Sequence, residues 1–168
     1  MTATDETLNG LREYNAELVE QYAKLEEYAQ ENERLRQLLD LKDTYKLEGV
    51  GARVIGRSSQ AWSQTITLDK GEADGVDTGL TVMGASGVVG QVISTTQNTS
   101  VVRLLTDPQS GAAAMVQSTR AEGIVRGSLE GLLYLEGLPS DAEVNPGDVV
   151  LTSGLGGSYA KGLLIGTI

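Results

Sequence analysis

The chain has 168 residues, a formal net charge of −10, and no cysteine, histidine or phenylalanine. The acidic charge argues against nucleic acid as a partner, because phosphate binding needs a surface rich in Lys and Arg. The missing residue types exclude a disulfide, a thiol nucleophile, a histidine-based catalytic triad and a zinc site of Cys and His ligands.

Residues 8–41 predict a long, polar helix with one narrow apolar stripe. Two columns of residues repeat every seven positions, with the alternating spacing of three and four that is typical of a coiled-coil seam. The predicted seam is Leu8, Leu11, Asn15, Leu18, Tyr22, Leu25, Ala29, Asn32 and Leu39. Its two asparagines cost stability but specify register. The stripe needs a second helix, so we predict a homodimer or a higher assembly; a solvated helix packed on its own globular domain is the alternative.

From Gly49 the apolar spacing changes from helical to alternating, which predicts short strands separated by Gly-rich turns. The expected strands are residues 50–55, 63–68, 79–83, 87–93, 100–105, 112–116, 123–125, 132–135, 149–152 and 162–168. Gly90 lies inside one of them and predicts a bulge or a tight bend. Together these segments indicate a mainly β module, of barrel or sandwich type, after the helix.

No catalytic constellation is visible in the β part. Almost all of its carboxylates stand beside Gly, Pro or Asn in predicted turns, where Asp bonds to its own backbone. The glycine clusters at residues 84–90 and 154–157 are not followed by a helix whose N-terminus would bind phosphate. We therefore expect a protein that is not an enzyme and that uses no cofactor or metal.

The two ends of the chain bear on its location. No apolar run reaches the roughly 18–20 residues that span a bilayer, and Thr2–Asn9 is too polar for a signal peptide. The last residues, Leu163–Ile168, predict a strand with no turn after it. We expect a fragment at both ends, with any membrane anchor lying upstream of Thr2.

Six segments, taken in order, resemble the rod shape-determining protein MreC family. They are residues 31–39, 52–57, 62–71 with 74–76, 87–92, 100–108, and 147–157 with 161–163. The motif positions to which we assign structural roles are Gly71, Gly75, Gly87, Gly90, Asp107, Pro108, Gly147, Asp148, Thr152, Ser153, Gly154, Gly156, Gly157 and Gly162. Tyr159-Ala160 stands where the family usually has an aromatic residue followed by Pro, so the local turn is expected to differ.

The resemblance implies a fold with three parts. A coiled-coil helix and linker would occupy residues 1–46. Two small six-stranded β-barrels of the trypsin-like type would follow, with the second inserted in the first. The first barrel would comprise residues 47–84 and 138–168, and the second residues 85–137.

The resemblance also implies a function. Proteins of this kind are non-catalytic scaffolds of the bacterial cell-elongation machinery, which maintain cell shape by organising peptidoglycan synthesis. Expected partners are a second copy, MreB, MreD and a penicillin-binding transpeptidase, with the region outside the cytoplasm and an upstream single-pass membrane anchor. The alternative is a periplasmic membrane-fusion adaptor of a transport system, although such adaptors need two antiparallel helices. An envelope hydrolase is disfavoured by the missing His and Cys.

Overall fold

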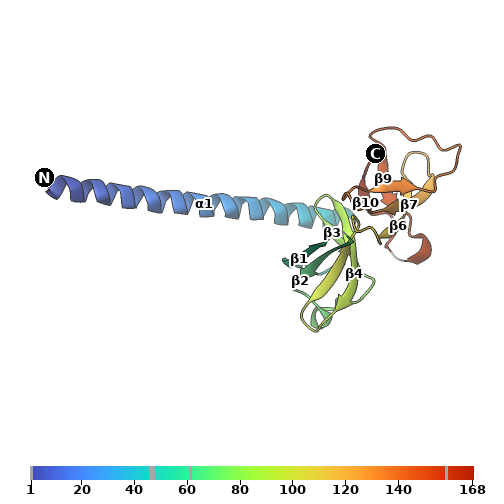
Figure 1. The fold of residues 1–168 in the computed structure, drawn as a ribbon, viewed down its shortest axis with the longest axis horizontal. Helices are drawn as coiled ribbons and strands as arrows, with labels where there is room; N and C mark the ends of the chain where they lie inside the picture. Colours follow the sequence, from blue (N-terminus) through green and yellow to red (C-terminus); the bar gives the residue numbers. More distant parts are fainter. Residues whose placement is uncertain (1, 46–47, 61, 158) are drawn as a thin grey trace. The chain divides into compact units, whose positions relative to one another are not determined.

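The computed structural model describes residues 2–45, 48–60, 62–157 and 159–168. It divides the chain into two units, residues 1–46 and residues 47–168, which are described separately below. The first unit is a single helix, and the second, here called the β unit, contains all ten strands of the described residues (Figure 1).

Residues Thr2–Tyr45 form one α-helix, α1, which covers the whole of the predicted coiled-coil stretch. Good helix formers fill most of its length and no proline interrupts it. Ion pairs one turn apart support it, from Lys24 to Glu20 at 3.4 Å and from Arg34 to Glu31 at 3.2 Å. In the described part of the chain, no helix combines the length and apolarity that crossing a bilayer requires.

The first sheet uses the strands β1 (Val54–Gln60), β2 (Ser63–Leu68), β3 (Thr81–Gly84), β4 (Gly87–Thr95) and β5 (Ser100–Leu104). They are hydrogen-bonded in the order β1-β2-β5-β4-β3, with every pair antiparallel. A short 3₁₀ turn, η1 (Glu72–Asp74), connects β2 to β3. The alternation of β2 buries Ile66 and Leu68, as predicted, and these pack with Val76, Val92 and Val102 in the core.

The second sheet uses β6 (Gly111–Val116), β7 (Glu122–Arg126), β8 (Tyr134–Glu136), β9 (Val149–Thr152) and β10 (Leu164–Thr167). Their order is β10-β9-β6-β7-β8, again antiparallel throughout. A second 3₁₀ turn, η2 (Leu155–Gly157), lies between β9 and β10. One cluster of its core contains Ala114, Val125 and Val150 with the partly buried Leu135 and Ile165. Ala112, Met115, Val116 and Leu163 are buried as well.

The strand pairings correct the expected domain arrangement. Each sheet has five strands with two free edges among the described residues, so the prediction of two closed six-stranded barrels is not confirmed. A boundary between residues 84 and 85 would separate β3 from β4, yet these strands pair as a hairpin, Gly84 opposite Gly87. So short a connection favours local pairing. The two sheets divide between Leu104 and Gly111.

Four strands, β1, β3, β8 and β10, begin two or more residues after their predicted starts. The first strand was expected at residues 50–55, but β1 runs from Val54 to Gln60, because its polar half pairs with β2 down to Gln60 opposite Ser63. The strand expected at residues 132–135 is β8, which starts only at Tyr134. The Ser128 hydroxyl accepts from the Leu132 N–H at 3.1 Å and donates to the Leu132 carbonyl at 3.0 Å, so Leu132 belongs to a turn.

Gly90 marks the bulge that its position predicted. The register between β3 and β4 shifts between Val82, opposite Gly90, and Met83, opposite Val88. A Cβ atom at Gly90 would overlap the backbone carbonyl of Arg103 on β5. The chain therefore needs glycine here because two backbones approach closely, and not for an unusual φ angle.

The loop between β9 and β10 is held by Thr152, which is fully buried. Its hydroxyl donates to the Ala160 carbonyl at 2.5 Å and accepts from the Leu163 N–H at 2.8 Å. The same loop contacts the first sheet, since the Ala160 N–H donates to the Thr81 hydroxyl at 3.3 Å. The C-terminal segment therefore returns to the first sheet by contact, while its strand β10 pairs in the second.

We predict that Gly154→Val destabilises the β unit by roughly 2–4 kcal/mol, because left-handed backbone strain adds to a steric clash. Gly154 has a φ of +75°, and its Cβ would lie 2.8 Å from the Cβ of Lys161. Thermal unfolding should show a melting temperature lower by at least about 8 °C. Gly166→Val is the control, since Gly166 has no positive φ and open space around it. Equal melting temperatures for both variants would contradict the prediction.

Candidate protein-interaction surfaces

Carboxylates of the β unit accept hydrogen bonds from backbone N–H groups in its turns. Asp74 accepts from the N–H of Gly71 at 3.2 Å, and Asp148 accepts from the N–H of Asn145 at 2.8 Å. These contacts confirm the interpretation of both residues as turn-forming. Within the described ranges, no group of three or more Asp or Glu side chains is arranged to hold a metal ion.

Asp107 is the carboxylate with the deepest position, at 1% exposed. One oxygen accepts from the Gln109 N–H at 2.7 Å, within its own turn, and the other accepts from the Gln64 N–H at 2.8 Å. The side chain therefore fastens the start of β2 to the turn that follows β5 and that contains Pro108. Both oxygens serve the fold, which leaves Asp107 no free position for acid–base chemistry.

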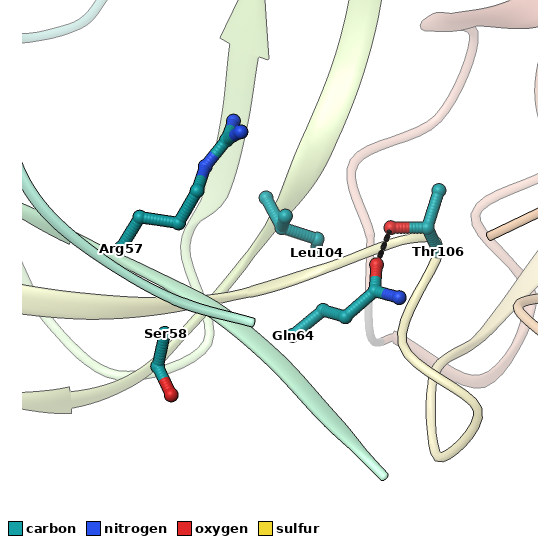
Figure 2. Close-up of a pocket in the computed structure, with 5 residues that line it drawn as sticks. All are labelled: Arg57, Ser58, Gln64, Leu104 and Thr106. Carbon is teal, nitrogen blue, oxygen red and sulfur yellow. Dashed lines mark hydrogen bonds between the residues drawn. The ribbon is translucent and has the colours of Figure 1, made fainter. Parts of the chain in front are cut away.

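A hollow of about 190 Å³ lies beside this turn, lined by Arg57, Ser58, Gln64, Leu104 and Thr106. Figure 2 shows Gln64 and Thr106 turned toward each other, with the Thr106 hydroxyl donating to the Gln64 amide oxygen and the Arg57 guanidinium pointing away. The hollow is smaller than the roughly 300–1,000 Å³ of small-molecule sites. Two of its polar side chains, Gln64 and Thr106, bond to each other, so the hollow offers little for a ligand.

The remaining motif positions lie in turns and at close backbone contacts. Gly71 contacts the backbone of residues 96–99, Ser153 is buried and donates its N–H to the Ala113 carbonyl at 2.9 Å, and Gly157 ends η2. Positive φ angles occur at Gly75, Gly87, Gly147, Gly154, Gly156 and Gly162. None of these positions lines the hollow. The structure gives them the surroundings of fold-determining residues.

All nine predicted seam positions of α1 are exposed in the single chain. Leu18 is 44% exposed and Leu25 is 64% exposed, although burying a leucine side chain is worth about 1.5–3 kcal/mol. Asn15 and Asn32 lie in the same stripe. The helix thus presents a continuous apolar surface that nothing in its own unit covers.

The apolar stripe of α1 is wider than the nine predicted seam positions. Tyr14, Tyr28 and Leu35 form a third column, three residues after Leu11, Leu25 and Asn32, and all three are exposed. The same 3-4 spacing connects this column to the leucine column, so the signal was present in the sequence. After Asn32 the apolar surface therefore passes from the Tyr22 side of the leucine column to the Tyr28 side.

The β unit exposes a second apolar surface that the sequence did not indicate. Ile124, Leu129, Leu132, Leu133 and Tyr134, here called the hairpin surface, lie on β7, on the start of β8 and in the turn between them. Leu129 is 69% exposed. Sequence patterns interpret such leucines as core residues, so only the strand pairings show them to be on the outside.

Tyr159 lies where the two sheets meet and is buried. Burial raises its pKa above the ordinary value, while a hydrogen bond with Ser110 and the positive charge of Arg103 act in the opposite direction. Ser110 follows the first sheet, Arg103 belongs to β5, and Tyr159 belongs to the loop before β10. The buried aromatic residue therefore lies close enough to Arg103 of the first sheet to be influenced by its charge, although no proline follows it.

Comparison with known sequences identifies relatives. The family profile described as rod shape-determining protein MreC, barrel core, matches residues 54–168. Cell shape-determining protein MreC from Listeria monocytogenes is 36% identical over 164 residues, which cover 94% of this chain and 56% of that protein. The chain spans about half the length of the curated relatives it matches.

Comparison with solved structures agrees. A structure of MreC superposes with a TM-score of 0.75 at 32% identity, covering 83% of this chain and 80% of that chain. A complex between the penicillin-binding protein PBP2 and MreC from Helicobacter pylori gives a TM-score of 0.53 at 18% identity, covering 70% and 74%. At that identity the second similarity shows the fold alone.

The junction at Tyr159 generates a pH prediction. Because the pKa is raised in the folded state, the stability that neutral Tyr159 contributes is complete below the unfolded pKa of about 10 and is lost as the pH rises through the folded value. Because Phe cannot ionise, the free energy of unfolding of Tyr159→Phe should fall less than that of wild type as the pH rises above about 10. Urea unfolding at several pH values on both sides of this point measures the difference, and parallel pH curves would contradict the prediction.

Proposed function

Because this chain belongs to the rod shape-determining protein MreC family, we propose that it is part of a scaffold of the bacterial cell-elongation machinery. The scaffold maintains cell shape by organising the enzymes that synthesise peptidoglycan. The observation that carries the proposal is the match of the family profile over residues 54–168, which includes every strand of the β unit.

A scaffold needs surfaces for partners and no chemistry of its own. The absence of His and Cys from the sequence removes the commonest catalytic bases and nucleophiles. Asp74, Asp107 and Asp148, which could have served as acids, accept backbone hydrogen bonds instead. These features support a non-catalytic role within the family.

The proposed partners follow from the surfaces and from the relatives. The apolar stripe of α1 supports pairing with a second copy, because its leucines are exposed in the single chain. A penicillin-binding transpeptidase is proposed because the MreC of Helicobacter pylori was solved in complex with PBP2. MreB, MreD, an upstream membrane anchor and a position outside the cytoplasm complete the proposal, by analogy with the family.

The adaptor alternative is not supported. The relatives compared above are cell shape-determining proteins, and a membrane-fusion adaptor would need two antiparallel helices. The described residues contain one α-helix, α1.

We predict that Leu18→Asp combined with Leu25→Asp abolishes self-association, because two carboxylates would enter the apolar seam. Sedimentation velocity should show the mass of a single chain, and thermal unfolding of the β unit should be unchanged. The matched control is Ala16→Asp with Ala23→Asp, which adds the same charge on α1 outside the seam. An unchanged mass of the leucine variant, or equal dissociation of the alanine variant, would contradict the seam.

The proposed function predicts what the full-length protein contacts in living cells. Photo-crosslinking amino acids at the exposed positions Trp62 and Leu129 should capture a penicillin-binding transpeptidase or MreD, identified by mass spectrometry. Samples kept in the dark serve as the control. Capture of an outer-membrane channel or a transporter instead would replace the scaffold by the adaptor.

A further inference from the structure

The hairpin surface is a cluster and not a scatter of exposed residues. Among the described residues 48–168, twelve large apolar side chains are exposed, and five of them lie between Ile124 and Tyr134. Isolated exposed apolar residues are normal on any protein, whereas a local cluster marks an interaction site.

The turn that carries this surface is ordered by its own hydrogen bonds. The N–H of Gly131 donates to the Ser128 carbonyl at 3.0 Å, and the Ser128 hydroxyl bonds to both backbone groups of Leu132. The base of the turn is fixed as well, since Gly127 contacts the backbone of Thr106 and Asp107. Leu129 and Leu132 are thus presented by a defined turn, and not by a loop that folds them inward.

The hairpin itself separates a core face from an outer face. Val125 is buried and Leu135, directly opposite it, packs on the core of the second sheet. The neighbouring pairs, Ile124 opposite Glu136 and Arg126 opposite Tyr134, are all exposed. β8 is the outer strand of its sheet, so one side of its backbone has no strand partner among the described residues. That side can pair with an added strand.

The sequence segment that contains this hairpin is acidic. Residues 121–148 contain six carboxylates and one cation, Arg126, whereas the rest of residues 47–168 contains six acidic and six basic side chains. Arg126 is already paired with Glu136 at 3.2 Å. Five of the six carboxylates are exposed. The hairpin therefore belongs to an acidic segment, whereas the remainder of the β unit has no net charge.

We propose that the hairpin surface binds an extended, apolar segment of the transpeptidase that carries Lys or Arg residues, which pairs along the free side of β8. This inference rests on the proposed function and adds the surface and the chemistry of the partner segment. The leucines supply apolar contact at the centre and the carboxylates supply a charged rim, as in specific protein interfaces.

Charge complementarity favours this occupant over the others. A second copy would bring the same acidic hairpin, and like charges across an interface oppose binding. A segment with Lys or Arg beside apolar residues satisfies both halves of the surface. The remaining neutral part of the β unit offers no equal attraction to a basic segment.

The test measures binding of the purified chain of residues 1–168 to a purified penicillin-binding transpeptidase from the same bacterium, by biolayer interferometry at two salt concentrations. The apolar variant is Leu129→Ser with Leu132→Ser, and the charge variant is Glu122→Gln with Glu130→Gln. Their controls are Val50→Ser with Leu80→Ser, and Glu48→Gln with Asp77→Asn, which change equally exposed residue types elsewhere in the β unit.

The apolar variant should raise Kd by about tenfold or more, as loss of anchor residues does, and the charge variant should reduce the salt dependence of binding. Both controls should stay within about twofold of wild type. If both hairpin variants bound the transpeptidase with the Kd of wild type, this inference would be overturned, and the proposed function would still stand. No binding by the wild-type chain would overturn both. A lower sedimenting mass of the hairpin variants would assign the surface to a second copy and overturn the inference.

Discussion

The β unit depends on one buried hydroxyl, that of Thr152. It fixes the loop between β9 and β10 from inside through its bonds to Ala160 and Leu163, and this loop then contacts the first sheet through Tyr159 and through the Thr81 hydroxyl. Each sheet alone has a small core without Phe. Joining the two sheets at this loop therefore lets two marginal cores behave as one unit.

The small cores also explain why the chain has two exposed apolar surfaces. Val and Ala make up most of the buried apolar residues, and many of the leucines and tyrosines of the chain are exposed. On α1 they form a stripe broad enough for a neighbouring helix, and on the β7–β8 hairpin they stand within an acidic rim. Both surfaces lie on regular, hydrogen-bonded elements, which reduces the entropy lost when a partner binds.

The sequence predicted correctly those features of the fold that depend on residues close together in the chain. β2 and β9 lie where alternation placed them, and the Gly90 bulge and the left-handed Gly154 follow from single residues. The division into sheets was not predicted correctly, because it depends on which distant strands pair. The exposure of Leu129 was not predictable either: a leucine is apolar in a turn as in a core, and only the Ser128 bonds show that the chain reverses there.

The exposure of Trp62, in the β1–β2 turn, determines how the protein fluoresces. Trp62 is the only indole of the chain and is 66% exposed. Its fluorescence in the native state should already resemble that of indole in water, so unfolding of the β unit changes the emission only slightly. Intrinsic fluorescence is accordingly a poor reporter of folding here. A protein that covers this turn would move the indole from water to an apolar contact, and the blue shift of its emission would report docking without any added label.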